Sequence, residues 1–330
     1  MQFFSLLKLQ MRTHISILFL LIPIAFYSQN FDDVDAKVLV YPRYSKVEEL
    51  AKKIEKDFST DANKVRAGFF WLAKNIRYNL KEFYNPKQRY YSFEYSSKTE
   101  KEQKLQGLKD KLIAATFRNK TGVCEEYAQS LKKICDLLGI EAAVIKGYVR
   151  NNVKEIGIIA NTTNHAWNAV KIDGKWKILD ATWGAGFERN GRWIREFNDY
   201  FFNMPKENIF KTHYPDDSIW VLRFGRMSPE TFFNQPIYKN ALLKLQSELI
   251  MPTSGIIEVV SSKDIILKFK KLDSSALISY RFKGEKHAKK TINSKEKNII
   301  TVLIKNPKRN SELTIFINNS DALHFKVIQR

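Results

Sequence analysis

The chain has 330 residues, 44% of them hydrophobic, so it is long enough to bury a core and to hold two domains. This composition excludes a disordered or fibrous protein. The formal net charge is +20, from 55 lysines and arginines against 35 aspartates and glutamates. We interpret this charge first as a solvated, lysine-rich surface, with attraction to an anionic cell-envelope component as the alternative. Nucleic acid is not expected as a partner, because the lysines are scattered and no helix-turn-helix pattern accompanies them.

Residues 1–29 have the pattern of a signal peptide. Lys8 and Arg12 precede an apolar run over residues 15–26. That run is shorter than the roughly 20 residues that span a bilayer, and it fits the apolar region of a cleaved signal. We therefore expect an exported protein, periplasmic or secreted, with no stable membrane anchor after cleavage. An uncleaved anchor is the alternative.

Two amphipathic helices are predicted next. Apolar residues recur at helical spacing from Val47 to Phe58, and again from Val65 to Ile76. Residues 81–107 are polar and weakly periodic, which predicts a surface loop, and a short helix is predicted over 109–117.

A further helix is predicted to begin at Cys124 and to end at Gly139, a residue typical of helix C-caps. The unpaired N–H groups and partial positive charge of a helix N-terminus favour a thiolate at this position. Cys135 lies three turns further on, roughly 16 Å away along a helix, whereas bridged cysteines need Cα atoms within about 7 Å. We therefore predict that Cys135 is a buried core thiol and that Cys124 is free.

A strand is predicted over 142–149, followed by a hairpin of strands 165–172 and 175–182 around Asp173-Gly174. A two-residue loop pairs residues whose numbers sum to 347. This register puts His165 and Asp180 on one face in a diagonal relation, with Cα atoms about 7–8 Å apart. The spacing thus predicts a hydrogen bond between the imidazole and the carboxylate.

The last part of the chain changes to short β-rich runs. A helix is predicted over 238–249, and beyond Pro252 the runs predict a small antiparallel sandwich. The predicted strands are 256–260, 265–269, 276–282, 299–304, 313–317 and 323–328. The sequence therefore divides into a signal peptide (1–29), a first domain (30–250) and a β-sandwich domain (251–330).

The chemistry-bearing residues fit nucleophilic acyl transfer. Cys124 would attack a carbonyl as thiolate, His165 would carry the proton between nucleophile and leaving group, and Asp180 would hold the imidazole in one tautomer. The backbone N–H of Cys124 would be one oxyanion donor. No metal site and no cofactor are predicted, because the sequence has no CxxC, HExxH or DxDxDG pattern.

Three motifs resemble the core of the transglutaminase-like superfamily, and look most like its kyphoscoliosis peptidase branch. They are Gly122-Val123-Cys124-Glu125-Glu126-Tyr127-Ala128, His165-Ala166-Trp167-Asn168-Ala169-Val170, and Gly174-Lys175-Trp176 with Leu179-Asp180-Ala181-Thr182-Trp183-Gly184-Ala185-Gly186. The resemblance covers about residues 40–235. It implies an α+β, papain-like or transglutaminase-like core, here followed by an immunoglobulin-like sandwich, with a Cys-His-Asp triad carried onto Cys124, His165 and Asp180.

We therefore expect a thiol-dependent acyl-transfer enzyme, a protease or amidase or a transglutaminase, acting on peptide or protein amides. The alternative is a non-catalytic binding module of the cell envelope that keeps the same fold. His213 and Asp217 are interpreted as structural, because they lie outside the triad motifs, and Trp167, Trp176 and Trp183 as packing around the site.

Overall fold

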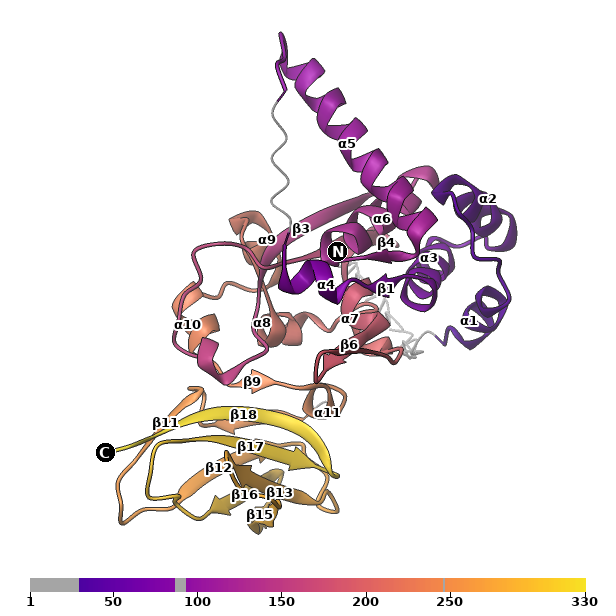
Figure 1. Ribbon diagram of the computed structural model, residues 1–330. Helices are drawn as coiled ribbons and strands as arrows, with labels where there is room; N and C mark the ends of the chain where they lie inside the picture. The colour runs from indigo at the N-terminus through magenta and orange to yellow at the C-terminus, as the bar shows by residue number, and fades with distance from the viewer. Residues whose placement is uncertain (1–29, 87–92, 246) are drawn as a thin grey trace, which may run out of the picture.

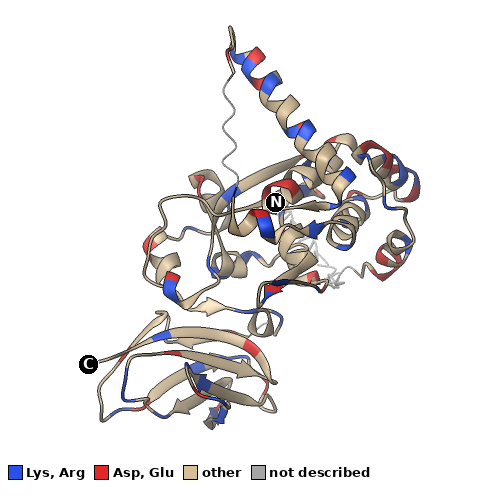
Figure 2. Cartoon of the chain, in the orientation of Figure 1, with Lys and Arg blue, Asp and Glu red and all other residues tan. Residues whose placement is uncertain are grey.

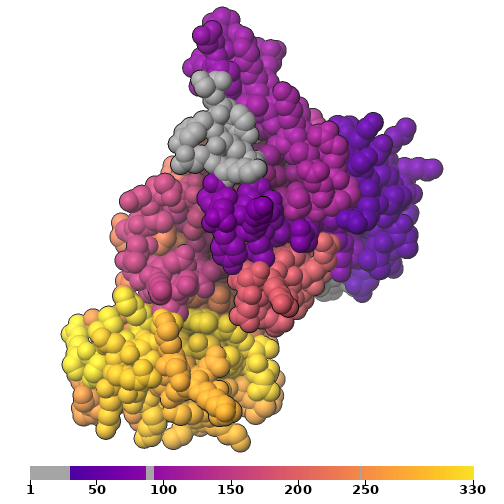
Figure 3. All heavy atoms as spheres, in the orientation of Figure 1, coloured from indigo at the N-terminus to yellow at the C-terminus, as the bar shows by residue number. Residues whose placement is uncertain are grey.

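The computed structural model describes residues 30–86, 93–245 and 247–330, so the predicted signal peptide lies outside the described residues. A larger lobe holds the earlier residues, and a smaller β lobe, yellow in Figure 3, holds the C-terminal ones. Within the described ranges, no helix combines the length and apolar character needed to cross a bilayer.

The larger lobe begins with a set of helices (Figure 1). They are α1 (Asp32–Leu39), α2 (Val47–Asp57), α3 (Asp61–Asn75), α4 (Leu80–Tyr84), α5 (Lys98–Asn119), α6 (Cys124–Leu137) and α7 (Ala181–Ala185). The predictions for α2, α3 and α6 are confirmed. Gly139 follows α6 with φ of +70°, a left-handed conformation that glycine adopts without strain.

An antiparallel sheet with strand order β5-β4-β3-β8 lies against these helices. Its strands are β3 (Ala142–Val149), β4 (His165–Ile172), β5 (Lys175–Leu179) and β8 (His213–Pro215). Helix α6 packs against β3 and β4, and α3 packs against α6. One hydrophobic core fills the space between helices and sheet, with Trp71 and Trp167 among its largest fully buried side chains.

The predicted hairpin register is confirmed. Asn168 pairs with Leu179 and Val170 with Lys177, each pair summing to 347, and Asp173 and Gly174 both have positive φ, as a primed two-residue turn requires. The second strand is shorter than predicted. It ends at Leu179, because residues 181–185 form α7 instead of continuing the strand.

The prediction of a loop over 81–107 is wrong at both ends, because α4 covers its start and α5 begins at Lys98, and residues 87–92 of this range lie outside the described residues. The Ser97 hydroxyl accepts the N–H of Glu100, and ion pairs one turn apart join Lys98 to Glu102 and Lys104 to Glu100. Such pairs and a side-chain cap stabilise a helix without an apolar stripe. Periodicity alone therefore missed the first three turns, which project from the lobe in Figure 1.

Short elements complete the larger lobe. They are β1 (Arg77–Tyr78), β2 (Thr121–Gly122), β6 (Gly186–Arg189), β7 (Arg192–Arg195), α8 (Ile209–Thr212), α9 (Ser218–Phe224) and α10 (Pro229–Asn234), with 3₁₀ turns at Val153–Glu155, Asp199–Phe201 and Lys206–Asn208. Parallel pairing of β1 with β2 places Tyr78 beside Gly122.

The smaller lobe is a β-sandwich of two sheets with its own hydrophobic core. One sheet has the order β10-β12-β16-β15, and the other β11-β18-β17-β13-β14, with β9 added to β18. The strands are β9 (Ile237–Tyr238), β10 (Glu248–Met251), β11 (Ile256–Val259), β12 (Ile265–Lys270), β13 (Ile278–Phe282), β14 (Lys289–Lys290), β15 (Ile292–Glu296), β16 (Ile299–Ile304), β17 (Ser311–Ile317) and β18 (Ser320–Gln329). The predicted fold class, an α+β core followed by a β-sandwich, is confirmed.

The helix predicted over 238–249 is wrong for most of its length. Among the described residues of this range only α11 (Asn240–Leu243) is helical, and it is followed by β10, which pairs with β12. Leu242 and Leu249 both contribute to the sandwich core. Residues 248–251 form a strand and not a helix because β10 pairs with β12 and extends a sheet. Local apolar spacing does not indicate such a tertiary contact.

Candidate active site

Cys124 is the first residue of α6, and its partly exposed thiol is free, as is that of the buried Cys135. The extended loop before it is fixed on both sides. The N–H of Asn79 donates to the carbonyl of Gly122, and the N–H of Val123 donates to Glu126 Oε2 at 3.0 Å. A Cβ at position 122 would stand 2.6 Å from the Cβ of Glu126. Only glycine therefore allows the carboxylate of Glu126 to fold back over the helix start.

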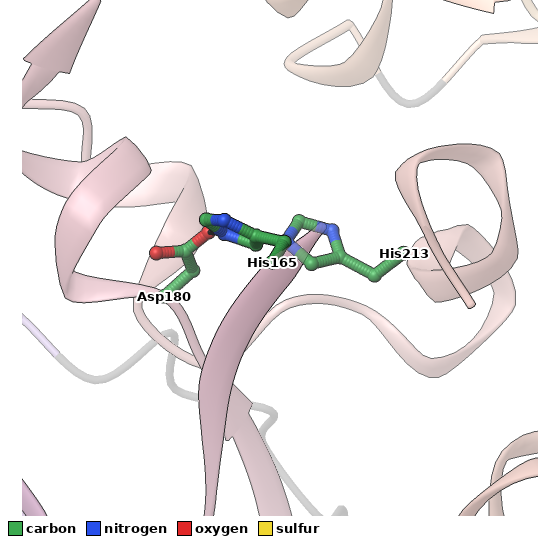
Figure 4. Close-up of side chains that lie close together, drawn as sticks. All are labelled: His165, Asp180 and His213. Carbon is green, nitrogen blue, oxygen red and sulfur yellow. Dashed lines mark hydrogen bonds and ion pairs between the residues drawn. The ribbon is translucent and has the colours of Figure 1, made fainter. Parts of the chain in front are cut away.

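His165 begins β4, and its ring lies against Asp180 (Figure 4). His165 Nε2 is 2.7 Å from Asp180 Oδ2, which confirms the predicted hydrogen bond. A carboxylate only accepts, so the proton lies on Nε2. Burial lowers the pKa of His165, but the charge and hydrogen bond of Asp180, with hydrogen bonding to Cys124, outweigh burial and raise it to about 10. At neutral pH the ring therefore carries a proton on each nitrogen.

Asp180 is buried and fully hydrogen-bonded. It is the N-cap of α7, where Oδ1 accepts the N–H groups of Thr182 at 2.8 Å and Trp183 at 3.0 Å. Its Oδ2 accepts from His165 and, at 3.1 Å, from His213 Nε2. Burial alone would raise the pKa of Asp180, but the charge and hydrogen bond of His165, with the hydrogen bond of His213, lower it. The carboxylate is therefore anionic and fixed in one orientation.

His213 is the residue that sequence reasoning undervalued. It begins β8, is fully buried, and shares Asp180 Oδ2 with His165, while its Nδ1 lies 2.7 Å from Thr212 Oγ1. Burial lowers the pKa of His213 and outweighs the opposing hydrogen bond and charge of Asp180. The signal available in the sequence was a histidine inside the resembling region, but no local pattern shows that β8 pairs with β3.

Aromatic rings enclose the two histidines, as predicted for Trp167 and Trp183. Trp167 stacks on His165 with ring centroids 6.0 Å apart and meets His213 edge-on at 4.9 Å, and Trp183 lies 4.8 Å from His213. Trp176 instead packs against Trp220, at 5.1 Å. The rings keep water from the imidazoles, which strengthens the electrostatic interactions inside the cluster.

The spacing of His165, Asp180 and His213 argues for hydrogen bonds and against a metal. Their potential ligand atoms lie within 4.8 Å of one another. In a tetrahedral zinc site, bonds of about 2.0–2.1 Å place neighbouring ligand atoms about 3.4 Å apart. Asp180 Oδ2 lies 2.7 Å and 3.1 Å from the two Nε2 atoms, which are hydrogen-bond separations. The three side chains therefore form a hydrogen-bonded cluster.

An apolar surface pocket lies on the other side of the sheet. Gly147 pairs with both His165 and Pro215, whereas Tyr148 pairs with Tyr214. Neighbouring residues on a strand point to opposite faces, so the tyrosines, which line the pocket, face away from His165. The pocket is therefore separate from the cysteine and histidine.

Comparison with known proteins shows what the chain is similar to. Residues 48–181 match the model of the transglutaminase-like superfamily. The chain is similar to the human kyphoscoliosis peptidase, with 24% identity over 238 residues, which cover 71% of this chain and 33% of that protein. It is also similar to Hillarin of Drosophila melanogaster, with 27% identity over 135 residues, covering 36% of this chain and 16% of that protein.

Among solved structures, one described as the crystal structure of a TGase aligns with a TM-score of 0.30 and 19% identity, covering 56% of this chain and 40% of that one. The match to the human kyphoscoliosis peptidase leaves two thirds of that protein unmatched. Residues 48–181 are therefore similar to the transglutaminase-like superfamily, and the chain resembles its kyphoscoliosis peptidase branch.

Proposed function

We propose that this protein is a thiol-dependent acyl-transfer enzyme acting on peptide or protein amides, with Cys124 as nucleophile, His165 as general acid and base, and Asp180 as the group that orients His165. The single observation that carries the proposal is the 2.7 Å bond between His165 Nε2 and Asp180 Oδ2, on a histidine that also hydrogen-bonds with the free Cys124 at the start of α6. This arrangement places the proton-carrying ring beside the nucleophile, as a cysteine–histidine pair requires.

The reaction follows from these roles. The Cys124 thiolate attacks the amide carbonyl, and the negative charge that develops on oxygen is stabilised by the Cys124 N–H at the start of α6. The His165 imidazolium gives a proton to the departing amine as the carbon–nitrogen bond breaks, leaving a thioester and a neutral ring. His165 then takes a proton from water or from a second amine, which attacks the thioester and releases Cys124. Water gives hydrolysis, and an amine gives transfer.

Location and partner complete the proposal. An exported protein, periplasmic or secreted, is supported by the signal-like residues 1–29. An anionic cell-envelope component as partner is supported by the net charge of +20 and by the lysines and arginines spread over both lobes and along α5 (Figure 2).

The test incubates the purified protein with a peptide pool and a primary amine, followed by mass spectrometry. We expect shortened peptides or amine adducts from the wild type and from Cys135→Ala, and a loss of at least about 10³-fold in Cys124→Ala, as expected when a nucleophile is removed. Cys135→Ala is the matched control, because it removes the other cysteine of the same helix. Equal product from wild type and Cys124→Ala would contradict the proposal, and no product from either would favour the binding module.

A further inference from the structure

We infer that His213 is a positioning residue of this site: by donating from Nε2 to the oxygen of Asp180 that also accepts from His165, it fixes the carboxylate and thereby aims His165 at Cys124. The inference rests on the proposed function for its kinetic consequence. Its structural part is that the His165–Asp180 hydrogen bond depends on His213, and this can be tested even if the protein turns over no substrate.

The two carboxylate oxygens of Asp180 are held in different ways. Oδ1 is held by the two N–H groups at the start of α7, which fix one end of the carboxylate to the backbone. Oδ2 is held only by side chains, those of His165 and His213. His165 is the group that must act during the reaction, so His213 is the permanent support at this oxygen.

The environment of His213 keeps it in that role. The side chain is fully buried, and burial favours the neutral ring, with one N–H. That proton lies on Nε2, because Asp180 only accepts, so Nδ1 accepts from the Thr212 hydroxyl at 2.7 Å. The titratable groups that act on the ring are Asp180 and His165. His213 is thus a neutral donor that stabilises the carboxylate without neutralising the charge that His165 needs.

Strand pairing places His213 beside His165. Val149 of β3 pairs with His213, and Gly147 pairs with both His165 and Pro215. His165 and His213 lie on the strands that flank β3, opposite Gly147 and Val149, and therefore point to the same face of the sheet. Their ring centroids are 5.6 Å apart. Trp167 packs against both rings, stacked on His165 and edge-on to His213.

The experiment compares His213→Gln, which keeps an N–H donor near the position of Nε2, with His213→Met, which has a similar length and no donor. We expect His213→Met to lower kcat about 10- to 100-fold with little change in KM, by analogy with outer-shell partners that orient metal-bound histidines. His213→Gln should recover kcat to within about threefold of the wild type. Equal kcat values for the two variants, or a change confined to KM, would overturn the inference.

A second measurement does not depend on activity. In proton NMR of selectively ¹⁵N-histidine-labelled protein, the His165 Nε2–H bonded to Asp180 should give a strongly downfield resonance that persists in His213→Gln and broadens or vanishes in His213→Met. If the resonance behaves so while no substrate turns over, the proposed function has failed and the positioning role has not. An unchanged resonance in His213→Met would overturn the positioning role even in an active enzyme.

A milder pair of variants guards against loss of folding. Thr212→Val removes the hydroxyl that donates to His213 Nδ1 and keeps the side-chain size, whereas Thr212→Ser keeps the hydroxyl. We expect Thr212→Val to weaken the His165 resonance and lower kcat in the direction of His213→Met, and Thr212→Ser to match the wild type. Identical behaviour of the two Thr212 variants in both measurements would count against the inference.

Discussion

Asp180 combines two duties that are usually assigned to different residues. One oxygen caps α7, and the other binds the two buried histidines. Asn is as good an N-cap as Asp, so Asp180→Asn removes the charge and leaves the helix start intact. This makes the electrostatic part of the site separable from its structural part by a single substitution.

Asp180→Asn should lower the free energy of unfolding by about 3–5 kcal/mol near pH 6, the usual cost when a buried ion pair loses one partner. The pKa of His165 is raised in the folded protein to about 10, so its contribution is fully present below pH 6.5 and is lost as the pH rises toward 10. The pKa of Asp180 is lowered, so its contribution is present above about pH 4 and is lost in acid. The difference between wild type and variant should therefore be largest between about pH 4 and 6.5.

Urea unfolding at a series of pH values measures this difference. Asp217→Asn is the matched control, because Asp217 also caps a helix, α9, by accepting the N–H of Ile219 at the surface. A gap between wild type and Asp180→Asn that stays constant from pH 6.5 to 10 would show that the His165–Asp180 pair does not carry the charge assigned to it.

The residues of the site were predictable to the extent that they belong to local patterns. Cys124 was found from a helix start, and His165 and Asp180 from the register of one tight hairpin. His213 was not, because β8 lies more than 30 residues beyond β5 and reaches β3 through a pairing that no turn signal specifies. Which distant strands pair depends on how the whole sheet packs. The periodicity of a single sequence carries no information on that packing.

At the scale of elements, the start of α6 depends on the loop before it, which lies close both to β1 and to the first turn of the helix. β1 and β2 pair beside the cysteine, and Gly122 gives Glu126 room to accept the N–H of Val123. The same elements were only partly visible in the sequence. The helix was predicted because it is amphipathic, whereas α5 was predicted too short because its first turns are charged on all sides.

Gly122→Ala should destabilise the protein by about 1–3 kcal/mol, because the added methyl would stand 2.6 Å from the Cβ of Glu126. Gly107→Ala, in the middle of α5, is the matched control. A methyl there meets nothing within 4 Å, so the variant should gain about 0.5–1 kcal/mol from helix propensity. Thermal and denaturant unfolding measure both. If Gly122→Ala is as stable as the wild type, the loop before Cys124 is less tightly packed than described.

At the scale of the whole molecule, the two lobes are joined through backbone as well as side chains. The N–H of Gly255, beside the sandwich strand β11, donates to the carbonyl of Asn234 at the end of α10, and Lys239 Nζ, just after β9, donates to the carbonyl of Asn151 at 3.2 Å. Arg150, buried in the larger lobe, donates to the carbonyls of Phe233 and Gln235 where the chain leaves that lobe. Burial lowers the pKa of Arg150 to about 10, so the guanidinium remains charged at neutral pH.

Arg150→Met should lower the free energy of unfolding by on the order of 3 kcal/mol, because it leaves buried carbonyls without a charged donor. It should also make the connection around Gln235 and Pro236, whose carbonyls Arg150 binds, more sensitive to limited proteolysis. Arg281→Met, on an exposed face of β13, is the control and should change neither property. Equal proteolysis rates for the two variants would show that Arg150 does not secure the connection between the lobes.

The position of β18 in the sandwich has a consequence for biosynthesis. It pairs with β17 and β11 inside the sheet and also with β9, yet among the described strands it is the last to be made. The sandwich sheet is incomplete until residues 320–329 have been made. The residues around Cys124 come much earlier in the chain. The larger lobe is thus complete in sequence before β18, and the sandwich closes around this last strand.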